Sequence, residues 1–345
     1  MESKFSRRIS GFEILINPVQ EKDLYELEPF IRNWELLPYE HYKEVTRDRA
    51  AVYLLSQLRE AILDPSNALL YQAQADRQAT GLICVRMLNW DSRIFGLKMA
   101  KIDPMVLKGT GSLSRESGAL LLERILRHCE AEGISHLSTR VDTKDILSIH
   151  LLEDQGFRLV DTLVTYLHNL RDFTRDDLEP DHLVRPFQPS DFAPMKDLAR
   201  KAFSNKGDML SRFYADPHLP DEKCDEFYGV WLENSVQRNE ADKVFVAELD
   251  QTPVGFITCK INPGIHHLLG VKIGYTPLTA VLPEVRKQGV YTSLKKAAMG
   301  WLKDRVDFLE SRTPISNITS QRIWVKLGGK LVSSHYTFHK WLDKS

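Results

Sequence analysis

The sequence contains an internal repeat, and this repeat restricts the chain to folds built from two similar halves. Residues 137–170 align without a gap with residues 309–342, at an offset of 172, and nine of these 34 positions are identical. Composition alone would give about two or three matches. The hydrophobic pattern repeats together with the identities. We therefore predict two related lobes in this chain of 345 residues, a length that itself suggests about two domains.

Each half predicts the same order of elements. A hairpin, over 69–87 and over 244–261, and a further strand precede a helix with apolar residues at i and i+4 spacing. A short strand, a second helix and a β-rich tail follow. The predicted first helix, short strand and tail are 118–133, 135–141 and 157–170 in one half, and 290–305, 306–312 and 330–342 in the other. The second helix of each half is expected to end at a glycine, Gly156 or Gly328–Gly329.

This order predicts an α/β fold of two tandem lobes, each a mixed, mostly antiparallel sheet flanked by helices. The stretch 171–181 is rich in charged residues and poor in apolar ones, which is typical of a linker. We therefore place the first domain at 1–172 and the second at 182–345.

Charge and cysteine usage exclude several classes of protein. The 46 basic and 47 acidic residues nearly cancel, so no global field recruits nucleic acid or an anionic membrane. No C-x-x-C pair is present, and we expect neither structural zinc nor a disulfide framework from the four cysteines, Cys84, Cys129, Cys224 and Cys259. The sequence has no secretion signal near its first residue and no run approaching about 20 apolar residues. A cytoplasmic protein is expected.

The segment 278–294 predicts an anion-binding turn. A β-prone run, 278–282, is followed by Pro283, Arg286, Gly289 and an amphipathic helix. A loop that enters a helix presents free N–H groups and the positive end of the helix dipole to an anion. Gly289 allows close approach of the backbone, and Arg286 adds a permanent charge. The alternative is an ordinary basic helix cap, but the position after a strand favours a pyrophosphate site.

The pattern V-x-P-x-x-R-x-x-G at Val281–Gly289 resembles the acyl-CoA signature of the GNAT N-acetyltransferase superfamily. The resemblance implies acetyl-CoA, or another acyl-CoA, as the co-substrate. It implies that main-chain groups of Val281 and Leu282 bind pantetheine and that Asn317 contacts the other side of CoA. The phosphates would be held by Arg286, Lys287, Gln288, Gly289, Val290 and Tyr291.

Two residues depart from the family pattern, and the first half lacks the turn. Tyr291 stands where a small residue is usual, and Trp324 stands where many members have tyrosine. At the offset of 172, Arg286 corresponds to Ser114 and Gly289 to Ser117. The first lobe therefore has neither the charge nor the glycine, and we expect one acyl-CoA per chain.

Several segments resemble the sugar-nucleotide branch of the family, the TDP-fucosamine acetyltransferases. They are 88–97, 152–160, 198–203 with 211–213, and 227–236. The resemblance implies transfer of an acetyl or short acyl group to the amine of a nucleotide-linked amino sugar, such as a dTDP-4-amino-4,6-dideoxyhexose, in polysaccharide biosynthesis. Another small amine, a peptide N-terminus, or a non-catalytic acyl-CoA-binding protein remain alternatives. A homodimer is left open, since sheets of this family often pair.

The acceptor is expected to contact the segment between the first strand of the second lobe and its hairpin. Arginine suits a nucleotide diphosphate, and aromatic faces suit a sugar or a base. The candidates are Ser211, Arg212, Phe213 and Tyr228. Packing in the core is the alternative for the aromatic residues, and we favour it for Trp231.

Catalysis requires a neutral amine, a donor to the oxyanion and a proton or hydrogen bond for the leaving thiolate. The resemblance places Trp324 at the position of the family's proton donor, but an indole N–H cannot release a proton near neutral pH. His335 and Tyr336 on the closing strand are the other candidates, each equally compatible with a structural role. We expect no metal site, because His266 and His267 would point apart on a strand.

Overall fold

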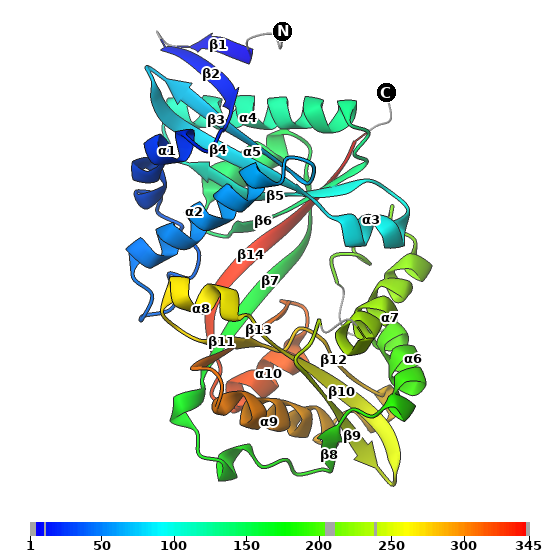
Figure 1. Ribbon diagram of the computed structural model, residues 1–345. Coiled ribbons are helices and arrows are strands. Elements are labelled where there is room, and N and C mark those ends of the chain that lie inside the picture. Colours follow the sequence, from blue (N-terminus) through cyan, green and yellow to red (C-terminus); the bar gives the residue numbers. More distant parts are fainter. Residues whose placement is uncertain (1–4, 10–11, 204–210, 238–239, 343–345) are drawn as a thin grey trace. The chain divides into compact units, whose positions relative to one another are not determined.

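The computed structural model describes residues 5–9, 12–203, 211–237 and 240–342. It divides into two compact units, each an α/β layer structure (Figure 1). Unit 1 comprises residues 1–160 and 335–345, and unit 2 comprises residues 161–334. The fold therefore agrees with the predicted pair of α/β lobes.

Unit 1 is built on a sheet whose strands are mostly antiparallel. Its strand order is β1–β2–β3–β4–β5–β6–β14, in which only β5 and β6 run parallel among the pairs described. The strands are β1 (Phe5–Ile9), β2 (Phe12–Pro18), β3 (Ala68–Ala75), β4 (Gln78–Met87), β5 (Met99–Leu107), β6 (His136–Asp142), the first residues of β7 (Arg158–Asn169) and the last residues of β14 (Lys330–Trp341).

Helices cover both faces of this sheet, and successive residues of its central strands are therefore buried. Leu82 and Ile83 of β4, which point to opposite faces, are both fully buried. The apolar stripe of α4 packs on one face, and α1 and α2 contact β3 and β4. The helices of unit 1 are α1 (Asp23–Arg32), α2 (Arg47–Leu63), α3 (Asn89–Phe95), α4 (Ser112–Ala131) and α5 (Ile146–Asp154).

Unit 2 repeats this plan. Its sheet has the order β7–β13–β11–β10–β9–β8, with β12 paired to β10, and only β11 and β13 are parallel among the pairs described. Besides residues 161–169 of β7, its strands are β8 (Val184–Pro186), β9 (Lys243–Leu249), β10 (Thr252–Ile261), β11 (Ile273–Tyr275), β12 (Thr279–Val281) and β13 (Phe308–Pro314).

The helices of unit 2 also form two layers. Figure 1 shows α6 and α7 on the opposite side of β9, β10 and β12 from α9. Phe256 and Ile257, neighbours on β10, are both fully buried, as two covered faces require. The helices are α6 (Phe192–Ala202), α7 (Asp221–Gln237), α8 (Pro263–Leu269), α9 (Val290–Lys303) and α10 (Ile318–Lys326), with 3₁₀ turns η1 (Leu170–Asp172), η2 (Asp176–Leu178), η3 (Pro189–Asp191) and η4 (Pro283–Val285).

The final strands of the two halves are exchanged. Residues 335–341 of β14 pair with β6 of unit 1, and residues 163–169 of β7 pair with β13 of unit 2. The chain therefore passes between units at 160/161 and at 334/335, inside strands, whereas the sequence placed the boundary at 172–182. The difference arises because each half completes its sheet with the last strand of the other half.

The repeat holds at the level of elements. β6, α5 and β7 correspond to β13, α10 and β14 with the same bounds, shifted by 172 residues. Both second helices end as predicted, at glycines with positive φ: Gly156 (φ 73°) and Gly328 (φ 78°). The prediction of a strand at His266 and His267 was wrong, because Asn262 caps a short helix there, α8, with Pro263 in its first turn.

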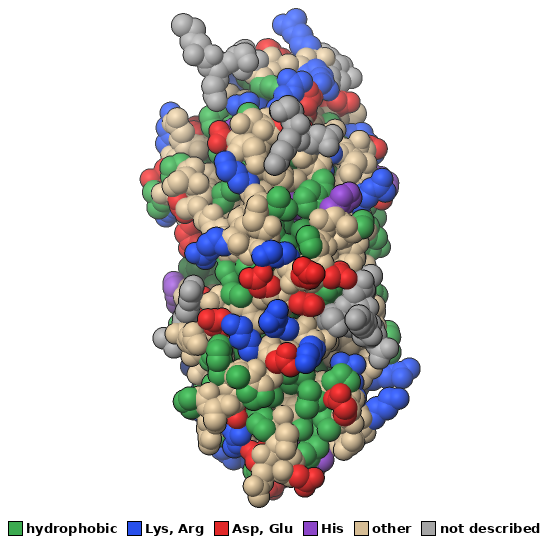
Figure 2. All heavy atoms as spheres, turned by 90° about the vertical axis from the view of Figure 1, so that its right-hand side faces the viewer, with side chains coloured by type: hydrophobic (Ala, Val, Ile, Leu, Met, Phe, Trp, Pro, Cys, Tyr) green, Lys and Arg blue, Asp and Glu red, His purple; other side chains and the backbone are tan. Residues whose placement is uncertain are grey.

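No helix in the described part of the chain combines the length and the apolar character that crossing a membrane requires. Figure 2 shows basic and acidic side chains intermixed on the face that it draws. This mixture agrees with the near-zero net charge of the sequence.

Candidate active site

The predicted phosphate turn lies between β12 and α9 in unit 2. After η4, Arg286 is extended (φ −61°, ψ 153°), Lys287 has φ 67°, and Gly289 has φ 87° as the N-cap residue of α9. The first N–H groups of α9 have no partner within the helix. The side chains of Arg286, Lys287 and Gln288 are exposed. Two cations and a helix N-terminus thus surround one turn, and this arrangement suits a diphosphate.

His182 supports the turn from the segment before β8. Its Nε2 lies 2.6 Å from the carbonyl oxygen of Gln288, and its backbone N–H donates to Ser293 Oγ at 3.2 Å. A Cβ atom at Gly289 would lie 3.2 Å from the same ring nitrogen. His182 was not predicted, because a histidine just after a charged linker carries no signal of a contact with a turn about a hundred residues later.

The strands beside the turn part from one another. β11 pairs with β10 on one side and with β13 on the other, up to the pair Tyr275–Glu310. Beyond this pair, β12 is paired with β10, while β13 remains paired with β7. The described strands therefore form a fork, with β12 on one arm and the end of β13 on the other.

Val281 and Leu282 differ in what their main-chain groups can do at the fork. Leu282 N–H donates to Val254 O at 2.9 Å, and Leu282 O accepts from Val285 N–H at 3.2 Å. Hydrogen bonding alternates along an antiparallel pair, so the N–H and C=O of Val281 point away from β10. Val281 therefore has main-chain groups on the open side of β12, whereas those of Leu282 are already used.

Asn317 is the N-cap residue of α10. Its Oδ1 accepts from Ser320 N–H at 3.2 Å, and its Nδ2 donates to Thr313 Oγ1 at 2.9 Å. Asp145 occupies the same place at the start of α5 in unit 1. Both ends of the Asn317 amide thus stabilise the loop between β13 and α10, and contact with CoA stays a prediction.

Trp324 and Tyr291 connect α10 and α9. The indole Nε1 of Trp324 donates to Tyr291 Oη at 3.0 Å, and the indole is only 4% exposed. Tyr166 of β7 packs edge-on against the same ring, with 5.6 Å between the ring centroids. Burial raises the pKa of Tyr291. The residue at the family's tyrosine position is thus a hydrogen-bond donor within a packed cluster.

Lys295, which was not among the predicted site residues, is the most unusual charged residue near the fork. It is 1% exposed, and its Nζ donates to Thr276 Oγ1 at 2.8 Å and to Ser311 Oγ. The ammonium also lies 5.1 Å from the centroid of the Trp324 ring. The signal was available in the sequence: Lys295 lies four residues after Tyr291 and three before Ala298, on the apolar stripe of the helix.

His335 and Tyr336, the other predicted catalytic residues, belong to unit 1, whereas Trp324 and the turn belong to unit 2. They pair with Asp142 and Val141 of β6, and Tyr336 packs against the core of unit 1. A catalytic role for either residue stays a prediction.

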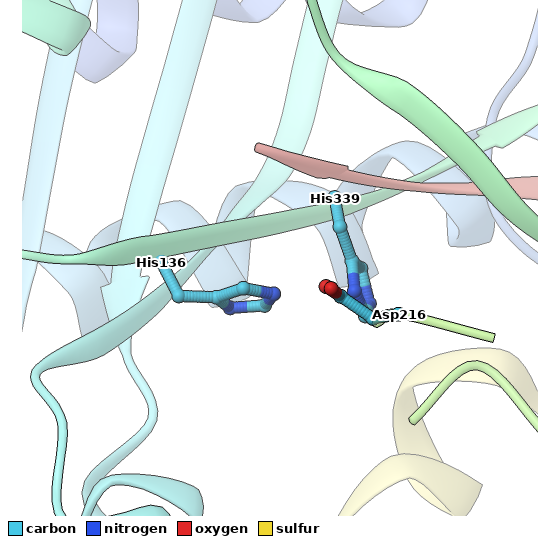
Figure 3. Close-up of side chains that lie close together, drawn as sticks. All are labelled: His136, Asp216 and His339. Carbon is cyan, nitrogen blue, oxygen red and sulfur yellow. The ribbon is translucent and has the colours of Figure 1, made fainter. Parts of the chain in front are cut away.

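Figure 3 shows two further imidazoles of unit 1, His136 on β6 and His339 on β14. Their ring centroids are 4.5 Å apart, at an interplanar angle of 84°. Both rings are buried, so in unit 1 they form part of the packing between the two strands. The prediction that the protein holds no metal stays a prediction.

The predicted acceptor residues lie in unit 2, at and before α7; residues 204–210 of the same segment lie outside the described part of the chain. Ser211, Phe213 and Tyr228 are buried, and the ring of Tyr228 stacks on Phe203 with centroids 4.3 Å apart. Arg212 is partly exposed, and its guanidinium covers the ring of Phe213 at 4.5 Å. Arg212 is therefore the best placed of the four to meet a ligand.

Unit 1 has a continuous helix where unit 2 has the turn. α4 begins at Ser112, six residues before the predicted start at Gly118, and so contains Ser114 and Ser117. Both serines are buried, and Ser117 Oγ is 2.7 Å from Thr80 Oγ1. A helix with inward-facing serines at the positions of Arg286 and Gly289 offers no equivalent turn.

Part of the chain matches a protein family, and most of it is similar to a known protein. Residues 208–328 match the family model described as Acetyltransferase (GNAT) family. The chain is 22% identical over 306 residues, 86% of its length, to the spore coat polysaccharide biosynthesis protein SpsD of Bacillus subtilis (strain 168), of which the alignment covers 96%.

Two solved structures resemble the whole chain. A GCN5-related N-acetyltransferase from Sphaerobacter thermophilus has a TM-score of 0.59 at 14% identity, covering 95% of this chain and 96% of that one. A tandem GNAT protein from the clavulanic acid biosynthesis pathway has a TM-score of 0.56 at 10% identity, covering 96% and 99%. These similarities agree with a fold of two GNAT-like lobes.

Proposed function

Because this chain belongs to the GNAT acetyltransferase family through residues 208–328 and is an acyl-CoA-dependent N-acetyltransferase, we propose that its acceptor is the amine of a nucleotide-linked amino sugar. A dTDP-4-amino-4,6-dideoxyhexose has the expected chemistry. The acyl donor would bind at the turn of unit 2, one molecule per chain. The similarity to SpsD, whose name refers to polysaccharide biosynthesis, supports a sugar acceptor.

The observation that carries the proposal is the turn at Arg286–Gly289 beside the fork. Arg286 and Lys287 are exposed cations at the N-terminus of α9, and both suit the diphosphate of CoA. Val281 has an N–H and a C=O on the open side of β12, which suits the amides of pantetheine. The buried serines of α4 support restricting the donor site to unit 2.

The acceptor assignment rests on fewer groups. Arg212 offers a guanidinium to a nucleotide diphosphate, and its neighbouring aromatic rings are mostly buried. Unit 2 would thus supply the donor site and at least one acceptor residue. The amine must be neutral to attack the thioester carbonyl, so the rate is expected to rise with pH as the acceptor amine loses its proton.

Calorimetric titration with acetyl-CoA tests the donor site. We expect saturable one-to-one binding by the unsubstituted protein and binding about ten- to a hundredfold weaker in Arg286→Ala, since a hydrogen bond to a charged group is worth about 1.5–3 kcal/mol. Arg115→Ala, in the corresponding region of α4, is the matched control and should bind normally. Equal affinity in all three proteins would contradict the assignment of the turn.

Release of free thiol tests the acceptor. The protein is mixed with acetyl-CoA and, in parallel, with a dTDP-4-amino-4,6-dideoxyhexose, glucosamine, or a peptide with a free N-terminus. We expect release with the nucleotide sugar at least tenfold faster than with the other amines. Faster release with the peptide would replace the sugar by a protein acceptor. Binding of acetyl-CoA without thiol release from any amine would indicate a non-catalytic acyl-CoA-binding protein.

A further inference from the structure

The ammonium of Lys295 occupies the vertex of the fork in unit 2. Thr276 follows the last residue of β11, and Ser311 follows Glu310, the last residue of β13 that pairs with β11. Lys295 Nζ donates to the hydroxyl oxygens of both, and these two oxygens are 3.5 Å apart. The charge therefore lies where the two strands separate, at the inner end of the opening proposed for the acyl donor.

No carboxylate neutralises this charge among the described residues. The hydrogen bonds of Lys295 go to two hydroxyl groups, and Glu310, buried on the next position of β13, is paired with Arg312 through Arg312 Nε at 2.6 Å. A buried ammonium without a counter-ion costs several kcal/mol, and an apolar side chain of the same length would avoid that cost. A residue that is unfavourable for folding at such a place is a candidate for function.

Among the described polar side chains near Lys295, only Lys295 has a pKa suited to donating a proton near neutral pH. Trp324 donates its N–H to Tyr291 and cannot release a proton near neutral pH. Burial raises the pKa of Tyr291, raises the pKa of Cys259 on β10 to about 12, and lowers the pKa of His168 on β7 to about 3. Burial lowers the pKa of Lys295 to about 7, with a smaller opposite effect of Cys259.

We propose that Lys295 is the general acid of the transfer reaction, giving its proton to the sulfur of the departing CoA. The acceptor nitrogen forms the new bond to the acyl carbon, the carbon–sulfur bond breaks, and its electron pair leaves on sulfur. One Lys295 N–H proton then moves to sulfur, which yields the free thiol and a neutral amine.

The acceptor nitrogen loses one proton as the amide forms, and this proton restores the ammonium of Lys295 through solvent. Protons and charges therefore balance over one cycle. Thr276 and Ser311 accept two N–H bonds of the ammonium, which leaves its third N–H as the one to donate to sulfur. This inference rests on the proposed acyl-transfer function and adds the proton donor that Trp324 cannot supply.

A titration of the unsubstituted protein tests the premise without requiring a variant to fold. Lysine labelled with ¹³C at Cε is incorporated, and the chemical shifts are followed by NMR from pH 5 to 11. We expect one lysine to titrate near pH 7, and this resonance should be missing from Lys295→Met. A Lys295 resonance that titrates above pH 9 would overturn the proposal.

Kinetic comparison tests the role itself. Lys295→Met should bind acetyl-CoA within about threefold of the unsubstituted protein in calorimetry, while kcat falls by about a hundredfold or more, the usual contribution of a general acid. Lys295→Arg keeps the charge but cannot release a proton at neutral pH, and it should not restore kcat. Lys296→Met, the adjacent lysine that pairs with Asp181 at 3.1 Å, is the matched control and should retain kcat.

The pH profile separates proton donation from a purely electrostatic effect. In the unsubstituted protein kcat should pass through a maximum, rising with pH as the acceptor amine loses its proton and falling as Lys295 loses its own, and the falling limb should be missing in Lys295→Met. Thiol release by Lys295→Met within threefold of normal, or full activity of Lys295→Arg, would overturn the proposal. Failure of the acyl-transfer function would be seen separately, as no thiol release by the unsubstituted protein with any amine.

Discussion

Replacing Lys295 by methionine is expected to stabilise the protein at pH 6 and to lose this effect near pH 9. The two side chains have similar length, so the substitution removes the ammonium without opening a large cavity. Burial lowers the pKa of Lys295 from 10.5 to about 7. The unfolded chain therefore binds one more proton than the folded chain between pH 7 and 10.5, and the stability of the unsubstituted protein rises with pH in that window.

The magnitude follows from the same shift. A change of about 3.5 units, at 1.36 kcal/mol per unit, sets an upper limit of about 5 kcal/mol for the cost of the buried charge below pH 7. Methionine loses the hydrogen bonds to Thr276 and Ser311, each worth at least about 1.5 kcal/mol from the charged ammonium and about 1 kcal/mol from the neutral amine. The expected gain is thus at most about 2 kcal/mol at pH 6. At pH 9 the remaining cost of about 2 kcal/mol is offset by the lost hydrogen bonds.

Urea unfolding followed by circular dichroism at pH 6, 7, 8 and 9 measures this difference. Two lobes can unfold in separate steps, so each curve is fitted with two transitions and the variants are compared at the same pH. Lys296→Met is the control, and its difference from the unsubstituted protein should not change with pH. A Lys295→Met protein that is less stable at pH 6, or whose stability difference is independent of pH, would refute the reasoning.

Other substitutions test the local supports of the two units. Asn317→Ala removes the cap of α10 and should lower the free energy of unfolding by about 1 kcal/mol. Asn317→Asp is the control that keeps the cap, and equal stability of the two variants would contradict the role of the cap. His182→Ala removes the contact to Gln288 O and should weaken acetyl-CoA binding by about two- to tenfold in calorimetry, since a hydrogen bond is worth about 0.5–1.5 kcal/mol; unchanged affinity would show that the turn holds without it. Gly118→Val places a Cβ 2.5 Å from Leu151 Cδ1 in unit 1 and should destabilise that unit by about 1–3 kcal/mol in urea unfolding. The affinity for acetyl-CoA should not change, and a loss of affinity would contradict a donor site confined to unit 2.

Local physical rules were sufficient for the strand–helix–strand elements that recur at the offset of 172 residues. Each of these elements is specified by a few neighbouring residues. The signals are the helix-ending glycines at 156 and 328, the apolar periodicity and the turn residues. The strand–helix–strand order and its offset of 172 residues could therefore be predicted from the chain alone. The turn at Arg286–Gly289 was also visible, because a glycine with φ 87° at a helix N-terminus is a local feature.

Three features depended on the tertiary structure. The tails that became β7 and β14 share Val160/Val332 and Thr165/Thr337, so nothing local specified which sheet each would join, and they are exchanged. The first turns of α4, which begins at Ser112, bury Ser117 against Thr80, a contact between distant residues.

The third feature is the environment of Lys295. The sequence places a lysine on an apolar stripe, but the distances to Thr276 and Ser311, and with them the lowered pKa, arise only when β11, β13 and α9 pack together. Secondary structure follows from interactions among near neighbours, whereas the chemistry of a buried charge depends on desolvation by the whole fold. The sequence therefore determined where the turn proposed as the donor site lies, and the packing of unit 2 determined the environment of Lys295, the residue proposed as its proton donor.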